Sequence, residues 1–379
     1  MSKDLVPDAD PRRDEIRRWI AEHRSPSPKE LAEAGLVCPH WPEPWGLNAD
    51  PIHQLLIDDE LAAAGIKRPV NTIGTGIAGP TILHAGTPEQ IERYIPKILT
   101  AEEIWCQLFS EPEAGSDLAS LATRAERDGD DFIINGEKVW TSFGHIAAYG
   151  VLLARTDPDA VTKQSGISYF LCPMDTPGIE VQPLIEITGK HSFNQVFFDD
   201  VRIPAENLIG EVNDGWQLAK VTLANERVAL SRAGALWGRG PTAEDLIAIV
   251  VDHGGAPTPS LRTRLVDLYI EAEILRVLRL RILDAKLRGV QPGAEASVTK
   301  AMGDEHGQRV MELAKDLAGP AGMLTDGGPM GTDVGKWHHG YLYARALTIG
   351  GGTSEVQRNI LAERTLGLPK IEADSPVGG

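Results

Sequence analysis

The stretch DFIINGEKVWTS, from Asp131 to Ser142, is where the sequence changes from helical to extended patterning. Two short apolar runs flank Asn135-Gly136, and this dipeptide predicts a tight hairpin turn between two strands. Four more short runs follow, separated by Gly, Pro and Asp, over residues 151–155, 167–173, 179–184 and 195–203. Short strands at such close spacing predict a compact β-barrel or sandwich.

Helical patterning lies on both sides of this region. Before it, apolar residues recur at three- and four-residue spacing over residues 14–23 and 51–64. After Trp216 the same spacing returns, over residues 261–288, 296–317 and 357–366. Such spacing places apolar side chains on one face of a helix. The order helical, β, helical therefore predicts an α+β multidomain protein.

The shift in spacing also sets the expected domain boundaries. A chain of 379 residues is long enough for several packed layers or domains. We expect an N-terminal helical domain over residues 1–104, a middle β domain over 105–210 and a C-terminal helical domain over 211–379.

The overall charge and composition exclude several functions. The formal charge is 37 − 54 = −17, which argues against a nucleic-acid surface because such surfaces need clustered Lys and Arg. No run of about 18 apolar residues is present, so no membrane span is expected and a cytoplasmic location follows. The three cysteines form no C-x-x-C pair, and we expect no metal site.

A glycine pattern near residue 74 has two possible interpretations, a dinucleotide-binding turn or a glycine-rich loop. Gly74, Gly76 and Gly79 match G-x-G-x-x-G, which in a dinucleotide-binding fold follows a strand and opens a helix. The preceding residues, IKRPVNTI, make a poor strand, and no strand–helix alternation surrounds the pattern. We expect a glycine-rich loop between N-terminal helices instead.

Four segments together resemble one family, the acyl-CoA dehydrogenases. They are CQLFSEPEAGSDL (106–118), NGEKVWTS (135–142), TGKHSFNQVFFDDVRIPAENLIGEVNDGW (188–216) and GGGTSEVQRNILAERTLGLP (350–369). The resemblance implies a helical N-terminal domain, a middle β-barrel and a C-terminal four-helix bundle. It also implies FAD and the α,β-desaturation of an acyl-CoA thioester, by α-proton abstraction and β-hydride transfer to flavin N5.

The resemblance also implies which residues hold the FAD. A flavin needs hydrogen bonds to its polar edge and a flat apolar wall for its ring. The main chain of residues 107–110 is expected at the pyrimidine edge, Trp140 against the ring and the Ser142 hydroxyl near N5. Ser116 is expected to contact the acyl-CoA as well. The full set of expected cofactor contacts is Gln107, Phe109, Ser110, Gly115, Ser116, Trp140, Ser142, Thr353 and Glu355.

The catalytic base departs from the commonest family pattern. Many members carry their catalytic Glu at the position that is Gly351 here. A smaller branch, with the isovaleryl and long-chain enzymes, carries it after the β domain and immediately before an Arg. This chain has Glu226-Arg227 there, so Glu226 is the predicted base and Arg227 is expected to orient the substrate or the base. Desolvation raises the pKa of a carboxyl group and makes its anion a stronger base.

Gly351 has two expected roles. Its backbone N–H is expected to polarise the thioester carbonyl. Its missing side chain leaves room for Glu226, and also for a branched or bulky acyl group at the substrate-binding site.

Two family segments that bind the FAD pyrophosphate of a neighbouring subunit are altered. No R-x-x-F-G follows Trp237, and Asp316 stands where the family has Gln. We therefore predict either a hetero-tetramer with a related subunit that supplies these contacts, or a homo-tetramer in which Arg262 or Arg264 substitutes. An electron-transfer flavoprotein is the expected electron acceptor.

Three other functions compete with this one. An acyl-CoA oxidase uses the same site but passes electrons to oxygen, and the sequence does not separate the two. A catalytically silent partner subunit is suggested by the missing Glu at position 351 and opposed by Glu226. A DNA-associated flavoprotein of the same superfamily is disfavoured by the negative charge.

Overall fold

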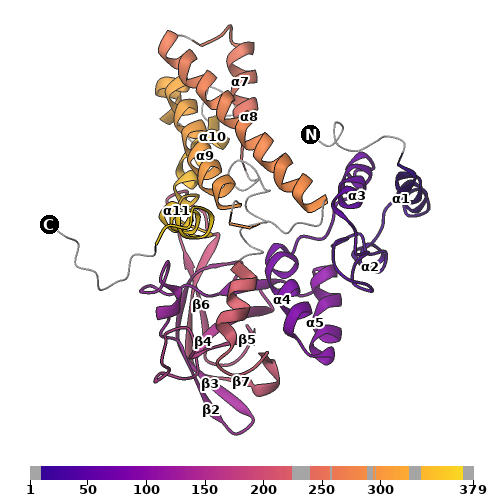
Figure 1. Ribbon diagram of the computed structural model, residues 1–379, viewed down its shortest axis with the longest axis vertical. Coiled ribbons are helices and arrows are strands. Elements are labelled where there is room, and N and C mark those ends of the chain that lie inside the picture. Colours follow the sequence, from indigo (N-terminus) through magenta and orange to yellow (C-terminus); the bar gives the residue numbers. More distant parts are fainter. Residues whose placement is uncertain are drawn as a thin grey trace, which may run out of the picture. The chain divides into compact units, whose positions relative to one another are not determined.

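The structure is a computed structural model that describes residues 10–223, 240–256, 258–287, 293–294, 296–323 and 334–369. By their internal contacts the residues divide into two compact units, Met1–Asn225 and Glu226–Gly379. The first contains helices α1 to α5 and the strands, and the second contains helices α7 to α11 (Figure 1). The predicted order, helical then β then helical, is confirmed.

Most helices of the first unit begin at the same sequence signal. Proline opens each of them directly after an Asp, Ser or Thr, in α1 (Pro11–Glu22), α2 (Pro28–Glu33), α3 (Pro51–Ala63) and α5 (Pro88–Thr100). The preceding side chain accepts a hydrogen bond from a backbone N–H of the first turn. Proline suits this position because the N–H it lacks has no partner within the helix.

The strands form one eight-stranded sheet. In chain order they are β1 (Trp105–Leu108), β2 (Arg124–Asp128), β3 (Asp131–Ser142), β4 (Tyr149–Arg155), β5 (Ile167–Pro173), β6 (Ile179–Leu184), β7 (Phe193–Pro204) and β8 (Leu208–Ile209). Their order in the sheet is β6-β7-β3-β2-β4-β5-β8, and β1 pairs with β4 in parallel. The long strand β3 thus lies between β7 and β2, where it contacts both.

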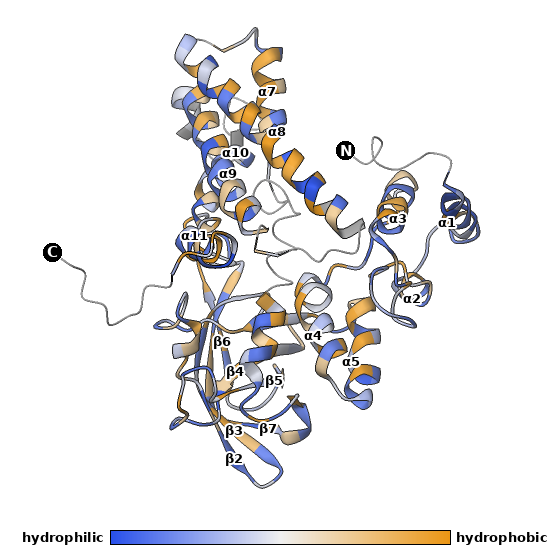
Figure 2. Ribbon diagram, in the orientation of Figure 1, coloured by the Kyte–Doolittle hydropathy of each residue, from blue (hydrophilic) through white to orange (hydrophobic). Residues whose placement is uncertain are grey.

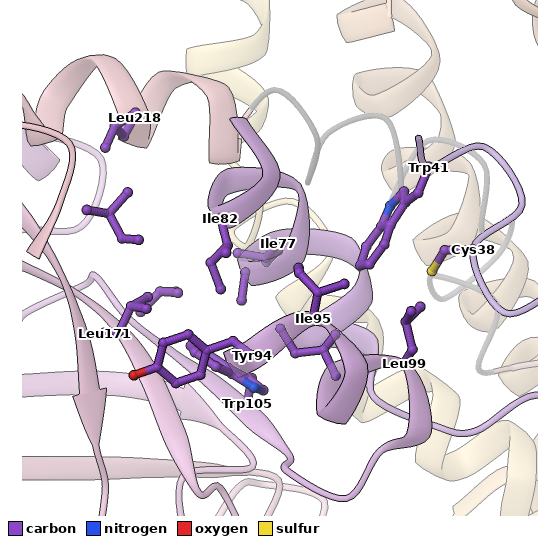
Figure 3. Packing of buried hydrophobic residues seen from close by; sticks show 14 of the residues in the cluster. Cys38, Trp41, Ile77, Ile82, Tyr94, Ile95, Leu99, Trp105, Leu171 and Leu218 are labelled. Carbon is purple, nitrogen blue, oxygen red and sulfur yellow. The ribbon is translucent and has the colours of Figure 1, made fainter. Parts of the chain in front are cut away.

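Side chains of β4 alternate between two apolar clusters, as the two-residue period of a strand requires. Val151 and Leu153 join a cluster that includes the helices, and Leu152 and Ala154 join a cluster of strand residues. Figure 3 shows the first cluster, in which helix residues pack around Trp105. The second cluster draws side chains from strands along the whole sheet, so the sheet curls around it.

The predicted hairpin at Asn135-Gly136 is wrong, because β3 runs through both residues. The turn lies earlier, between β2 and β3, at Gly129 and Asp130. Asn135 instead exchanges hydrogen bonds with Asp200 of β7, accepting from its N–H and donating to its carboxylate, both at 3.0 Å. A Cβ on Gly136 would lie 2.7 Å from the Cα of Thr123, so glycine is required for close strand approach.

The predicted glycine-rich loop at residues 74–79 is also wrong. Residues Gly74–Ala78 form a π-helical turn that continues directly into α4 (Gly79–Ala85). A Cβ on Gly79 would collide with the ring of Trp41, and a Cβ on Gly74 would collide with the side chain of Asn71. The glycines therefore allow close packing of this helical segment, and residues 10–73, the described part of the chain before them, contain no strand.

The second unit is helical. Its helices are α7 (Ala243–Asp252), α8 (Pro259–Leu287), α9 (Ala296–Ala318), α10 (Val334–Tyr343) and α11 (Ser354–Ile360), which a π-helical turn, Leu361–Thr365, extends. α9 packs against α7, α8, α10 and α11 around its own apolar cluster. Figure 2 shows charged and apolar residues interleaved along α8. Among the described helices, none is long and apolar enough to cross a membrane.

Candidate functional site

The end of β1 and the end of β3 lie side by side in the first unit. The N–H of Val139 donates to the carbonyl of Ser110 at 2.8 Å. The half-buried Gln107 lies in β1, three residues before Ser110, and Phe109 is buried between them. Residues 107–110 and 138–142, which are separate in the sequence, therefore lie side by side.

A buried ion pair joins the same two segments. The Lys138 ammonium, which is 0% exposed, lies 2.7 Å from the Glu111 carboxylate and donates to the carbonyl of Phe109 at 3.1 Å. Glu111 accepts further hydrogen bonds from the N–H groups of Ala122 and Thr123. The sequence alone did not mark Lys138 or Glu111 as functional, although both lie within the family motifs quoted above.

Burial and pairing shift the pKa values of these two groups. Burial lowers the pKa of Lys138 to about 8, and the nearby Glu111 carboxylate opposes this effect. Burial alone would raise the pKa of Glu111, but the Lys138 ammonium and the backbone hydrogen bonds outweigh it and hold that pKa below its usual value. Both groups are therefore predominantly charged at neutral pH.

Trp140, in the second of these segments, is unusual in both its backbone conformation and its exposure. It has a φ of 61°, in the left-handed region that non-glycine residues rarely adopt, and the residue is 61% exposed. Phe193 of β7 meets its ring edge to face at 5.8 Å. Phe143, three residues on, also has a φ of 61°. Backbone strain of this kind costs free energy and is concentrated at functional sites.

The neighbours of Trp140 complete this half of the site. Ser142, which is half-buried, pairs with Phe193 across β3 and β7. The hydroxyl of Thr141 is buried and has no hydrogen-bond partner among the described residues. Gly115 and Ser116 are exposed and follow a turn in which Glu111 and Ala114 exchange backbone hydrogen bonds at 3.1 Å. The structure thus presents an uncovered flat ring beside hydroxyl groups and a main-chain edge.

The remaining expected contacts lie in the second unit. Thr353 caps α11 by accepting a hydrogen bond from the N–H of Val356 at 3.2 Å. Glu355 is exposed in the first turn of α11, and hydrogen bonds from its own N–H and from Thr353 lower its pKa. Gly351 precedes them with a φ of 65°. These three residues are therefore gathered around the start of one helix.

Glu226 and Arg227 lie outside the described residues. The helical segment that leads toward them is described as far as Leu223, and Thr222 anchors it. The Thr222 hydroxyl, 0% exposed, donates to the carbonyl of Leu218 at 3.0 Å. It also lies 2.9 Å from the hydroxyl of Thr81 and 3.3 Å from that of Tyr169, whose pKa burial raises to about 12.

Asp316 has a partner that the sequence did not identify. Arg264 of α8 donates to its carboxylate at 2.5 Å. Of the two arginines considered as substitutes for the missing family residues, Arg264 therefore lies at the altered position. The positive charge of Arg264 offsets the negative charge of Asp316.

A flat aromatic side chain beside polar main-chain groups is a lining that suits a flavin ring. Family models of the acyl-CoA dehydrogenase N-terminal, middle and C-terminal domains match residues 8–102, 106–201 and 213–366. The chain therefore belongs to the acyl-CoA dehydrogenase family, an FAD-dependent family of oxidoreductases that act on CH–CH donors.

Three relatives show how far the similarity extends. The acyl-CoA dehydrogenase FadE34 of Mycobacterium tuberculosis is 47% identical over 340 residues, 90% of this chain but only 46% of that protein, so the chain spans about half its length. The acyl-CoA dehydrogenase IpdE1 of the same organism is 39% identical, over 92% of this chain and 89% of that protein. The solved structure "Tcur3481-Tcur3483 steroid ACAD" is 32% identical with a TM-score of 0.80, and the match covers 98% of this chain and 95% of that one.

The residues present fit an FAD. The exposed Trp140 offers the apolar wall, the main chain of residues 107–110 offers polar groups for the pyrimidine edge, and the Ser142 hydroxyl offers a polar group for the region of N5. Which of them contact the cofactor stays a prediction, as does the role of Thr353 and Glu355.

Proposed function

We propose that this chain introduces an α,β double bond into an acyl-CoA thioester, with Glu226 as the base. The observation that carries the proposal is Trp140, a strained tryptophan with an uncovered ring beside Ser142. Exposing a large aromatic ring and straining its backbone are both unfavourable unless a ligand uses them. A flat, redox-active ring system is the ligand that suits this wall in a family that depends on FAD.

Each residue of the proposed site has a separate role in the reaction. Glu226 takes the α proton onto a carboxylate oxygen as the double bond forms, and Arg227 orients the substrate or the base. The backbone N–H of Gly351 holds the thioester oxygen, on which negative charge develops. Trp140 and Ser142 fix the position of the cofactor, and Ser116 contacts the acyl-CoA. When bound, FAD supplies the acceptor for the β hydride.

Substitution of the base tests this assignment. Glu226→Gln keeps the shape of the side chain but cannot accept the proton, so kcat should fall by about 1,000-fold, within the range for general bases. Flavin content should stay at the wild-type value. Glu211→Gln, at an exposed glutamate, is the matched control and should leave the rate unchanged.

The outcome of this test also decides between the chain as enzyme and the chain as silent partner. Bleaching of the flavin by substrate in Glu226→Gln at the wild-type rate would remove Glu226 as the base. A wild-type assembly whose flavin no acyl-CoA bleaches would leave only the catalytically silent role. Peroxide formed in equal amount with product would indicate an oxidase rather than a dehydrogenase.

We propose a branched or bulky acyl group as the substrate. The absence of a side chain at Gly351 supports this, and so does the similarity to a structure named as a steroid ACAD. The test is a panel of straight-chain, α-methyl and steroid side-chain thioesters with an artificial electron acceptor. A kcat/KM at least ten-fold higher for a straight-chain thioester than for every bulky one would contradict the proposal.

We propose a related subunit as the partner. The missing R-x-x-F-G segment and Asp316 in place of Gln support a partner that completes the cofactor site, and the name of the steroid ACAD joins two proteins. Expression of the chain alone should give less than full flavin occupancy. Full occupancy and turnover without a partner would instead support a homomer in which Arg264 substitutes. The cytoplasmic location, the tetramer and an electron-transfer flavoprotein as acceptor stay predictions.

A further inference from the structure

A buried lysine in α9 has no role in the mechanism described above. The side chain of Lys300 is 1% exposed, and its ammonium donates to the carbonyls of Leu347 at 3.0 Å, Gly350 at 2.8 Å and Gly352 at 2.8 Å. The Asp304 carboxylate, one helical turn along, lies 2.5 Å away. Burying an ammonium group is costly unless it is paired and hydrogen-bonded, and here carbonyl groups of one short segment satisfy it.

Two of these carbonyls belong to three consecutive glycines, residues 350–352, which we call the glycine turn. Gly351 and Gly352 have φ values of 65° and 90°, where a residue with a Cβ is strained. Gln357 of α11, which is 0% exposed, donates from Nε2 to the carbonyl of Gly351 at 3.1 Å and to that of Gly352 at 3.4 Å. All three carbonyls of the glycine turn therefore point to Lys300 or Gln357.

Gln357 contributes only its donor end. Its Oε1 atom is buried and has no hydrogen-bond partner among the described residues. A buried acceptor without a partner costs about 1–3 kcal/mol. The Gln357 amide is therefore tolerated despite its unpaired oxygen. What it contributes is the two hydrogen bonds that it donates to carbonyls of the glycine turn.

The direction of the carbonyls sets the direction of the N–H groups. In a planar trans peptide the C=O and N–H bonds point in opposite directions, so the N–H groups of Gly351, Gly352 and Thr353 point away from Lys300 and Gln357. No described residue accepts a hydrogen bond from any of these three groups. Successive N–H groups in a glycine-rich turn bind anions and partly negative oxygens.

We infer that Lys300 is a positioning residue of the acyl-CoA site. Its ammonium holds the glycine turn in the left-handed conformation, so that the outward N–H groups meet the oxygen of the thioester as negative charge develops there. The inference rests on the proposed function and adds the residue that fixes the geometry of the donors. Asp304 forms an ion pair with the ammonium within α9, and Gln357 supports the turn from α11.

The experiment measures the stretching frequency of the thioester carbonyl in the bound ligand. An enoyl-CoA labelled with ¹³C at its thioester carbonyl is bound to the oxidised, flavin-loaded assembly, and isotope-edited infrared difference spectra give the stretching frequency. Wild-type protein should lower this frequency relative to free thioester. Lys300→Met with Asp304→Asn, which removes both charges together, should abolish at least half of that shift. It should also lower kcat by about 10- to 100-fold, as expected when oxyanion donors are displaced, with a smaller change in KM.

A matched control separates positioning from stability. Arg13 and Glu60 form another buried ion pair, at 2.7 Å, between α1 and α3. Arg13→Met with Glu60→Gln should lower the melting temperature but leave the carbonyl frequency unchanged. If the Lys300 and Asp304 double variant lowers only the melting temperature and keeps the wild-type frequency and kcat, the inference is overturned, whereas the proposed function stands.

Two further outcomes are distinguishable. If the double variant does not fold, Gln357→Met removes two donors to the glycine turn without leaving a charge, and its carbonyl frequency decides: an unchanged value overturns the inference. If no thioester bleaches the flavin of the wild-type assembly, the proposed function fails, and this result does not depend on Lys300.

Discussion

Two buried lysines hold main-chain carbonyls in the two units, but their surroundings differ. Lys138 of β3 binds the carbonyl of Phe109, and its counter-ion, Glu111, belongs to another segment and accepts hydrogen bonds from two more backbone N–H groups. The counter-ion of Lys300, Asp304, lies on the same helix, so among the described residues the hydrogen bonds of Lys300 beyond α9 go to the segment from Leu347 to Gly352. The first lysine links several strands and loops, whereas the second supports one turn.

This difference predicts which property of the protein depends on each lysine. The segments around Lys138 also have ordinary sheet hydrogen bonds, such as that from the N–H of Val139 to Ser110. Lys300 and Gln357 supply the donors for the carbonyls of the glycine turn. We therefore expect Lys138 to affect mainly stability and cofactor retention, and Lys300 to affect mainly the geometry of a few donors.

The largest effect is expected from Lys138→Met. This change leaves the Glu111 carboxylate buried without its ammonium partner, which typically costs about 3–5 kcal/mol. The free energy of unfolding, measured by urea titration, should fall by about 3 kcal/mol because the backbone hydrogen bonds to Glu111 remain. The flavin-to-protein ratio should fall with it.

Two controls accompany Lys138→Met. Adding Glu111→Gln removes the lone charge and should restore more than half of the lost stability. Arg202→Met breaks an exposed ion pair with Asp128 and should cost less than about 1 kcal/mol. A Lys138→Met protein as stable as the wild type would contradict the assigned role of the buried pair.

Lowering the pH should also weaken the pair of Lys138 and Glu111. The loss of stability should be smaller than that caused by Lys138→Met, because protonation removes the charge of Glu111 instead of leaving it without a partner. The pKa of Glu111 is held below its ordinary value of 4.5 in the folded protein. Its contribution to stability is therefore fully present above pH 4.5 and is lost as the pH falls through the lower folded value. Melting temperatures measured from pH 6 downward should fall more steeply for the wild type than for Lys138→Met with Glu111→Gln. Parallel curves would contradict this linkage.

Much of the fold was predictable because it depends on local patterns. The predicted helix over residues 261–288 is α8, Pro259–Leu287, and the strand over 167–173 is β5 with the same bounds. The Asn-Gly signal failed because its two residues serve contacts from elsewhere, Thr123 against Gly136 and Asp200 against Asn135. No short sequence window contains those partners.

The two lysines could not be predicted for a related reason. Lys138 is 29 residues from the carbonyl of Phe109, and Lys300 is 47 residues from that of Leu347. Their partners are mostly backbone carbonyls, which every residue carries, so no residue type marks the contact. The motif residues were easier to find because residues 107–116 and 140–142 are grouped in the sequence as well as in space. The predicted base stays untested, since residue 226 lies outside the described part of the chain.

A moderate effect is expected from Gly352→Ala in the glycine turn. A left-handed φ costs a residue with a Cβ about 1–2 kcal/mol. The added Cβ would also lie 2.7 Å from Nε2 of Gln357, which must move and release its hydrogen bonds. The free energy of unfolding should fall by about 2 kcal/mol, and kcat should fall as well.

Gly129→Ala is the matched control for this substitution. Gly129, in the turn between β2 and β3, has a similar left-handed φ of 64°, and an added Cβ there meets nothing within 4 Å. It should show the conformational cost alone, with kcat unchanged. Equal losses of stability and activity in the two variants would contradict a special role for the contact with Gln357.

The smallest effect on stability is expected at Trp140, although its effect on function is large. Trp140 is 61% exposed, so Trp140→Phe should change the free energy of unfolding by less than about 0.5 kcal/mol. The smaller ring offers less wall to the flavin, and the dissociation constant of FAD should rise about ten-fold, which corresponds to about 1.4 kcal/mol. Titration of the apoprotein assembly with FAD, followed by flavin fluorescence, measures it, with Val161→Ala as a control at another exposed apolar residue. An unchanged dissociation constant for Trp140→Phe would mean that the strained, uncovered ring has some other purpose, and the first unit would then hold its cofactor through the main-chain edge alone.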